Sequence, residues 1–225
     1  MSQTRTHSGV LTVGPDYHAR GGIASVLEVY SRTIPGFTFL PTNSRRGKVA
    51  GYLNLISTMA RMPFYRMRGY GILHAHGACG KSFVRKAMVL AWGRALGFRT
   101  IFHAHGGGFP AYAAKIGEDR ARAVLGKCSA IAVLARSWVP YYRDVMCHSR
   151  VVVVENIIDA PARLPERLPS AELRLLFLGK LCRDKGIYDL LEALAAHKDE
   201  FAGRVSLRVG GVGETDIFLE RVRSL

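Results

Sequence analysis

Acidic residues are scarce in the first two thirds of this 225-residue sequence, and none lies between Glu28 and Glu118. Residues 1–158 hold 21 Lys and Arg against 6 Asp and Glu, whereas residues 159–225 hold 11 of each. The net charge of +15 therefore belongs entirely to the first segment. A field of one sign attracts nucleic acid, anionic lipid or a phosphorylated substrate. A basic surface that serves only solubility is the alternative.

Long apolar runs and paired cysteines are also missing. No apolar run reaches the ~18 residues that a membrane span needs. The polar start of the chain, residues 1–9, has no apolar signal core. The four cysteines show no C-x-x-C spacing, which fits a reducing compartment. These absences predict a cytoplasmic protein, and a hydrophobic content of 48% is enough for a globular core.

Short apolar runs alternate with segments of helical periodicity, and this alternation predicts a doubly wound parallel sheet of the α/β class. Strands are expected at residues 10–14, 37–40, 71–74, 100–103, 130–134 and 151–154. Helices are expected at residues 22–33, 49–62, 81–96 and 138–145. Pro63 is expected to end the second helix, because proline removes a helical hydrogen bond.

The alternation of predicted strands and helices stops at residues 159–172. Pro161, Pro165 and Pro169 in this segment indicate an interdomain linker. Residues 1–158 would form one Rossmann-like domain, and residues 173–225 would begin a second. The second segment offers strands at 173–178 and 205–209, with helices at 186–195 and from about 214. Two strands do not complete such a sheet, so the second domain is expected to be incomplete here.

Gly21 and Gly22 follow the first predicted strand and precede a helix. Glycines at this place let the backbone approach a phosphate, and the helix N-terminus supplies N–H donors. The alternative is an ordinary tight turn. No G-x-G-x-x-G pattern is present, so a nicotinamide fingerprint is not met.

Two H-A-H motifs end neighbouring predicted strands, one with His74 and His76 and the other with His103 and His105. Strand alternation places the members of each pair on one face of the sheet. The second motif is followed by Gly106 and further glycines. A histidine of this motif could donate a hydrogen bond to a sugar hydroxyl or to a leaving phosphate. The four histidines could instead bind zinc. This alternative is less favoured, because no carboxylate or cysteine is placed in the sequence where it would add a zinc ligand. Packed or capping histidines are the other alternative.

Lys180, Arg183 and Lys185 lie in a predicted turn between a strand and a helix, an arrangement that suits a diphosphate. A charged surface turn is the alternative. The segment 209–214, V-G-G-V-G-E, repeats the strand, glycine and helix arrangement more weakly.

Together these motifs resemble glycosyltransferase family 4, the retaining enzymes of the GT-B fold. F-L-G-K-L-C-R-D-K-G-I-Y-D-L-L-E-A, residues 177–193, is the most specific match. H-A-H-G-G-G-F resembles the H-x-H-G motif of bacterial polysaccharide enzymes, and V-E-N-I-I-D at 154–159 resembles P-N-G-V-D. Lys180 stands where the family usually has arginine. The family's E-x7-E motif is absent and is expected beyond Leu225.

The resemblance implies an acceptor domain, a donor domain and transfer of a sugar from a nucleotide sugar with retention, in polysaccharide biosynthesis. Lys180 and Lys185 would bind the donor diphosphate, with the backbone N–H groups of Gly21 and Gly22. His105 would be the catalytic contact to the donor sugar or the acceptor hydroxyl. Further sugar or acceptor contacts are assigned to His103, Gly106, Asn156 and Gly211. No metal and no cofactor are expected, because the lysines neutralise the leaving group and the nucleotide sugar is a substrate.

A membrane role is predicted from six basic residues of the acid-free stretch, Arg45, Arg46, Lys48, Arg61, Arg66 and Arg68, of which Arg45, Arg46 and Lys48 are assigned to face the membrane. They flank an apolar set at helical spacing, Tyr52, Leu53, Leu55, Ile56, Met59 and Met62, which is typical of a segment on an anionic bilayer. The resemblance to polysaccharide enzymes implies a polyprenyl-diphosphate-linked saccharide as the acceptor, which fits a location at the inner face of the membrane. The alternatives are an apolar face that packs on the sheet, or an inactive homologue that only binds polyanions or membrane. No nucleic-acid partner is expected, since no recognised module is visible.

Overall fold

A computed structural model describes residues 9–19, 21–163 and 170–224 of the chain. The chain divides into two compact units, Met1–Ala160 (unit 1) and Pro161–Leu225 (unit 2). Most of the polar N-terminal start, and Pro165 and Pro169 of the predicted linker, lie outside the described residues.

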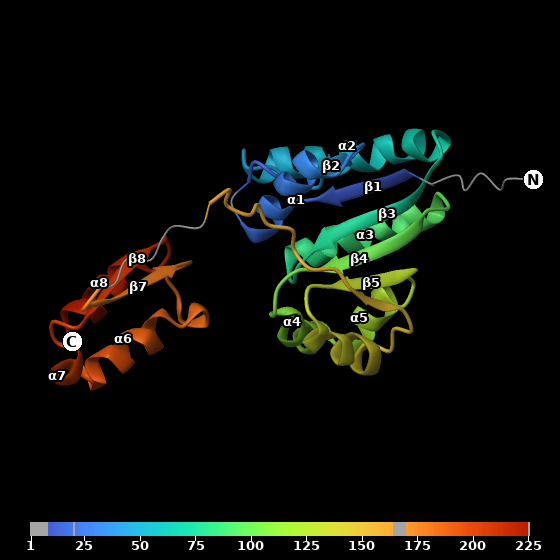
Figure 1. The fold of residues 1–225 in the computed structure, drawn as a ribbon. Helices are drawn as coiled ribbons and strands as arrows, with labels where there is room; N and C mark the ends of the chain where they lie inside the picture. The colour runs from blue at the N-terminus through green and yellow to red at the C-terminus, as the bar shows by residue number, and fades with distance from the viewer. Residues whose placement is uncertain (1–8, 20, 164–169, 225) are drawn as a thin grey trace, which may run out of the picture. The chain divides into compact units, whose positions relative to one another are not determined.

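Unit 1 is built on a six-stranded, wholly parallel sheet, as the alternation in the sequence predicts (Figure 1). The strand order is β2-β1-β3-β4-β5-β6. The strands are β1 (Gly9–Gly14), β2 (Thr38–Pro41), β3 (Tyr70–Gly77), β4 (Arg99–Ala104), β5 (Ala130–Val133) and β6 (Val151–Val153). The order reverses direction between β1 and β3, so the loops that follow these two strands diverge. Parallel sheets bind ligands at such a switch point, outside the carboxyl ends of the strands.

Helices cover both faces of this sheet. They are α1 (Gly22–Thr33), α2 (Lys48–Met67), α3 (Lys81–Ala95), α4 (Phe109–Ile116) and α5 (Glu118–Leu125). Tyr30 of α1 meets His76 edge to face on one side, with ring centroids 5.6 Å apart. Phe83 of α3 meets Phe102 in the same way on the other side, at 5.8 Å. The sequence did not predict α4. The helix expected at 138–145 is instead a 3-10 turn, Arg136–Trp138, and a π-helical turn, Tyr141–Val145.

The prediction that Pro63 ends the second helix is wrong, because α2 continues to Met67. A proline inside a helix leaves the carbonyl four residues earlier without its backbone donor, and here that carbonyl belongs to Met59. The indole Nε1–H of Trp92, on α3, donates to the Met59 carbonyl oxygen at 2.9 Å. The orphaned acceptor is thereby satisfied, and the helix passes through the proline.

Unit 2 pairs two parallel strands, β7 (Leu173–Leu178) and β8 (Val205–Gly210). Its helices are α6 (Ile187–Ala196), α7 (Lys198–Phe201) and α8 (Thr215–Arg223), with a 3-10 turn at Arg183–Lys185. Its small core consists of Leu181, Ile187, Tyr188, Leu191 and Phe218. The sequence predicted both strands and the two longer helices of this unit.

Candidate functional site at the carboxyl edge of the sheet

Gly21 and Gly22 lie at the start of α1, after β1. Gly21 is the N-cap of α1 with φ 137°, a conformation that favours glycine, and no side chain in the described part of the chain caps the helix. A Cβ placed at Gly21 or Gly22 would meet no atom of the described residues within 4 Å, and both glycines are exposed. Packing within unit 1 therefore does not explain these two glycines, and an approaching anion would meet free N–H groups there.

The four histidines of the two H-A-H motifs gather on one face of the sheet. His76 of β3 is directly opposite His103 of β4 in the parallel register. His74 Nε2 lies 3.2 Å from His103 Nδ1, and His76 Nδ1 lies 2.9 Å from His105 Nε2. The prediction that the two members of each pair share a face is confirmed, and the parallel register brings both pairs to the same face.

Hydrogen bonds fix the proton positions on two of these rings. His103 Nε2 lies 3.2 Å from the Val154 carbonyl oxygen, which accepts only, so the proton of a neutral His103 is on Nε2. Its Nδ1 then accepts from His74 Nε2–H. Burial lowers the pKa of His74 to about 3 and of His103 to about 4, and both rings are neutral near pH 7.

This burial limits what the predicted histidines offer to a sugar. His103 is 0% exposed and both its ring nitrogens are hydrogen-bonded, so it has no free nitrogen for a saccharide. His105 is 6% exposed, and its Nε2 is occupied by His76. Only Nδ1 of His105 remains to contact a substrate. Gly106 follows with φ 97°, is exposed, and has open space around it.

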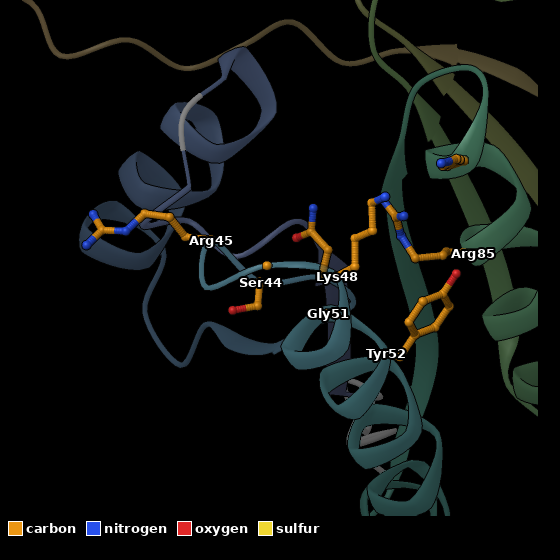
Figure 2. Close-up of a pocket in the computed structure, with 9 residues that line it drawn as sticks. Ser44, Arg45, Lys48, Gly51, Tyr52 and Arg85 are labelled. Atoms are coloured by element: carbon orange, nitrogen blue, oxygen red, sulfur yellow. The ribbon is translucent and has the colours of Figure 1, made fainter.

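A basic cavity of about 280 Å³ lies between the loop after β2 and the starts of α2 and α3 (Figure 2). Its lining residues come from the loop after β2, the start of α2 and the start of α3: Asn43, Ser44, Arg45, Gly47, Lys48, Gly51, Tyr52, Lys81 and Arg85. Four of these carry a positive charge and none carries a negative one. In Figure 2 Lys48 and Arg85 reach into the same space, whereas the Arg45 side chain points away from it. The cavity is suited to a phosphate or diphosphate.

The sequence interpretation singled out Arg45 and Lys48 of this cavity but missed Lys81 and Arg85. The signal was present, since Lys81 and Arg85 are four residues apart on one predicted helix within the acid-free stretch. Arg46 is exposed and is not a lining residue.

Helix α2 has two apolar faces, one buried and one exposed. The apolar residues that were predicted to lie on the membrane are divided between these two faces. Leu55 and Met62 are 4% and 0% exposed and pack into the core, with Met59 packed against them. The prediction of a membrane-facing role is therefore wrong for these core-facing residues. On the opposite face, exposed apolar residues recur at helical spacing: Val49, Tyr52, Leu53 and Ile56, between 61% and 74% exposed. This second face begins beside the basic cavity, which Tyr52 also lines.

Asn156 and Gly211 have different surroundings. Asn156 is exposed on the segment after β6, which an ion pair of 2.9 Å between Arg32 and Asp159 ties to α1. A Cβ at Gly211 would lie 1.8 Å from the Gly179 carbonyl oxygen. Close packing of two chain segments in unit 2 thus requires glycine at 211, which explains this residue without a ligand.

Lys180 and Lys185 are both exposed in unit 2. Lys180 follows β7, and Lys185 ends the 3-10 turn before Gly186, the N-cap of α6. A cavity of about 450 Å³ in this unit is lined by Arg183, Tyr188, Glu192, Glu214, Ile217 and Arg221, and neither lysine is among them. Lys185 therefore lies beside the start of α6 and Lys180 just after β7, both outside that cavity.

No family model and no curated protein matches the chain. Within the described ranges, none of the helices combines the length and apolarity that a bilayer crossing requires.

Proposed function

We propose that this chain belongs to a retaining glycosyltransferase of the GT-B fold, which moves a sugar from a nucleotide donor to a lipid-linked saccharide in cell-surface polysaccharide biosynthesis. The proposal rests on the sequence resemblance and on the distribution of charge over the two units. Unit 1 would bind the acceptor, and unit 2 would bind the donor. The basic cavity between the starts of α2 and α3 in unit 1 is the observation that carries it.

The cavity matches the diphosphate of a polyprenyl-diphosphate-linked acceptor. Lys48, Lys81 and Arg85 supply point charges and a guanidinium fork, and the start of α2 adds backbone N–H donors. Since no acidic side chain lines the cavity, a bound diphosphate meets attraction without local repulsion.

The exposed apolar face of α2 is suited to the lipid part of such an acceptor, as the cavity is suited to its diphosphate. Val49, Leu53 and Ile56 would contact acyl chains at the inner leaflet, while Arg45 and Arg46 contact anionic head groups. Each cation near such a surface contributes about 1 kcal/mol at most, so attachment would be reversible and weakened by salt.

A charge-reversed cavity is expected to lose this ligand. Lys48→Glu combined with Arg85→Glu should weaken binding of farnesyl diphosphate about 100-fold, because two charge-assisted hydrogen bonds become repulsions. Isothermal titration at low salt measures the affinity.

The matched control is Arg99→Glu combined with Lys127→Glu, which reverses the same two charge types at exposed positions outside the cavity. This control should bind as the wild type does. If both double variants bind equally weakly, the effect comes from net charge and not from the cavity. If the wild type binds farnesol as tightly as farnesyl diphosphate, the proposal is contradicted.

In unit 2, Lys180 and Lys185 would neutralise the leaving diphosphate of the donor beside the start of α6. Retention requires the acceptor hydroxyl to attack on the face from which the diphosphate departs. Stabilising the leaving group is therefore the main task of the protein, with His105 Nδ1 as the contact to a sugar or acceptor hydroxyl.

Lys185→Ala should lower the affinity of the chain for UDP or GDP about tenfold or more, through loss of one charge-assisted hydrogen bond. Lys127→Ala removes the same charge from unit 1 and should change nothing. Titration with both nucleotides measures the difference. An unchanged nucleotide affinity in Lys185→Ala would remove this lysine from the donor site.

The charge distribution also favours a second candidate function, a protein that binds polyanions or membrane without catalysis. The same titration separates the two. Binding of farnesyl diphosphate and of vesicles with no measurable affinity for UDP or GDP would favour the second candidate over the transferase.

A further inference from the structure

Two buried histidines, His76 and His103, and the half-buried His74 bring their ring nitrogens close together. One ring nitrogen from each of His74, His76 and His103 lies within 4.8 Å of the other two. Adjacent parallel strands produce this convergence, since His76 and His103 are register partners and His74 precedes His76 on the same face. The three side chains are therefore held by backbone hydrogen bonding rather than by flexible loops.

One nitrogen of this cluster has no protein partner. His76 Nε2 is buried and makes no hydrogen bond to the described residues, while Nδ1 of the same ring is paired with His105. His76 is 0% exposed. Leaving a buried polar nitrogen unpaired costs free energy, so packing alone does not account for a histidine at this position.

We propose that His74, His76 and His103 form a binding site for a divalent transition-metal ion of the zinc class, through His74 Nε2, His76 Nε2 and His103 Nδ1. Two imidazole nitrogens on one tetrahedral zinc ion are about 3.3 Å apart. His74 Nε2 and His103 Nδ1 are already 3.2 Å apart. Binding would move the His74 proton from Nε2 to Nδ1, and each ring would remain neutral.

The outer contacts are those that metal-binding histidines usually make. His103 donates its other N–H to the Val154 carbonyl, and His76 donates Nδ1–H to His105 Nε2. His105 is then a positioning residue for His76. No carboxylate belongs to the three-histidine set, so the bound ion would keep its positive charge and leave a fourth position for water, hydroxide or another anion.

The site is tested on the full chain after dialysis against a chelator, by titration with Zn²⁺ and by the visible absorption of Co²⁺. The wild type should bind one equivalent of Zn²⁺ and give the strong d–d bands of a tetrahedral cobalt ion. His76→Gln should weaken Zn²⁺ binding at least about 100-fold, His105→Gln about tenfold, and the exposed His197→Gln not at all.

Equal Zn²⁺ affinity in His76→Gln and His197→Gln, or a wild-type cobalt spectrum of octahedral type, would overturn the proposal. If His76→Gln does not fold, the half-buried His74→Gln takes its place, and the wild-type cobalt spectrum decides without any variant. The inference is independent of the proposed function, because the three histidines are separate from the basic cavity and none of these measurements uses a sugar, nucleotide or lipid.

Discussion

Gly211→Ala is expected to unfold unit 2 while unit 1 stays folded. The new Cβ would lie 1.8 Å from the Gly179 carbonyl oxygen, where real Cβ atoms are not found below 3.0 Å. The two segments would have to separate by more than about 1 Å, which breaks the 3.0 Å hydrogen bonds from Gly179 N to the Gly210 carbonyl and from Leu181 N to the Val212 carbonyl. We expect a cost of about 3 kcal/mol or more, as large as the stability that so small a core supplies.

Hydrogen–deuterium exchange of peptides that cover β7 and β8 measures this effect, since both strands should lose protection. Gly203→Ala is the matched control. It places Cβ in open space at φ 69°, so only backbone strain of about 1 kcal/mol is expected. Full protection of both strands in Gly211→Ala would show that the segments accommodate the methyl group.

The second large effect is a rise in the stability of unit 1 between pH 7 and pH 9, caused by Lys86. This side chain is 1% exposed, and its ammonium group donates to Thr42 Oγ1. Burial, with a smaller contribution from Arg85, lowers the pKa of Lys86 from 10.5 to about 7. Across the range between these values the unfolded chain binds more protons than the folded one, so stability increases with pH, by about 2 kcal/mol from pH 7 to pH 9.

Urea denaturation followed by tryptophan fluorescence measures this rise, because both tryptophans, Trp92 and Trp138, lie in unit 1. Lys86→Met should abolish the rise, whereas the exposed Lys81→Met should keep it. The measurements end at pH 9 because burial raises the pKa of Cys128 to about 11, which reverses the dependence at higher pH. A rise of equal size in Lys86→Met would assign the effect to another group.

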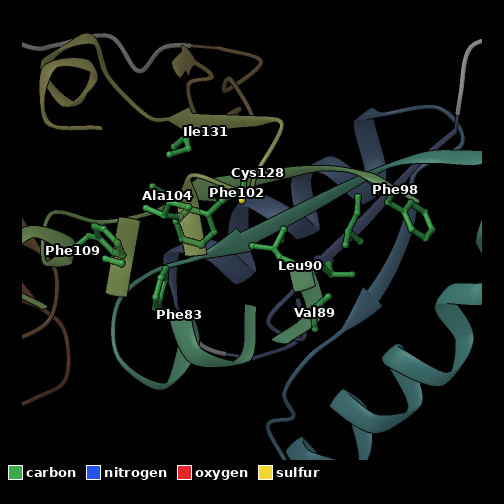
Figure 3. Packing of buried hydrophobic residues seen from close by; sticks show 14 of the residues in the cluster. Phe83, Val89, Leu90, Phe98, Phe102, Ala104, Phe109, Cys128 and Ile131 are labelled. Atoms are coloured by element: carbon green, nitrogen blue, oxygen red, sulfur yellow. The ribbon is translucent and has the colours of Figure 1, made fainter. Parts of the chain in front are cut away.

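The buried position of Lys86 follows from helical periodicity in the sequence. Phe83, Lys86, Leu90 and Gly93 share one stripe of α3, and that stripe packs on the sheet (Figure 3 shows Phe83 and Leu90). The alternation of strands and helices was predictable for the same reason. That the two histidines of each H-A-H motif share a face followed from the two-residue period of a strand, whereas the register that joins the two motifs did not.

Contacts between distant segments were not predictable from local pattern. Pro63 indicates a helix end when it is read alone, and only the packing of α3 supplies the Trp92 donor that lets α2 continue. The basic cavity combines residues after β2 with residues after β3, and no sequence period connects these two places. Burial of His103 likewise depends on the segment after β6, whose Val154 carbonyl covers it.

The two sheets differ in how their margins are protected against pairing with another molecule. The outer strands of the sheet in unit 1 are short, and β2 also contains Pro41, so they offer few free backbone groups. In the two-stranded sheet of unit 2 each strand is an edge, both are six residues long, and β7 exposes Leu176 and Leu178 at 64% and 73%. Intermolecular strand addition and aggregation on concentration or heating are therefore expected to begin in unit 2.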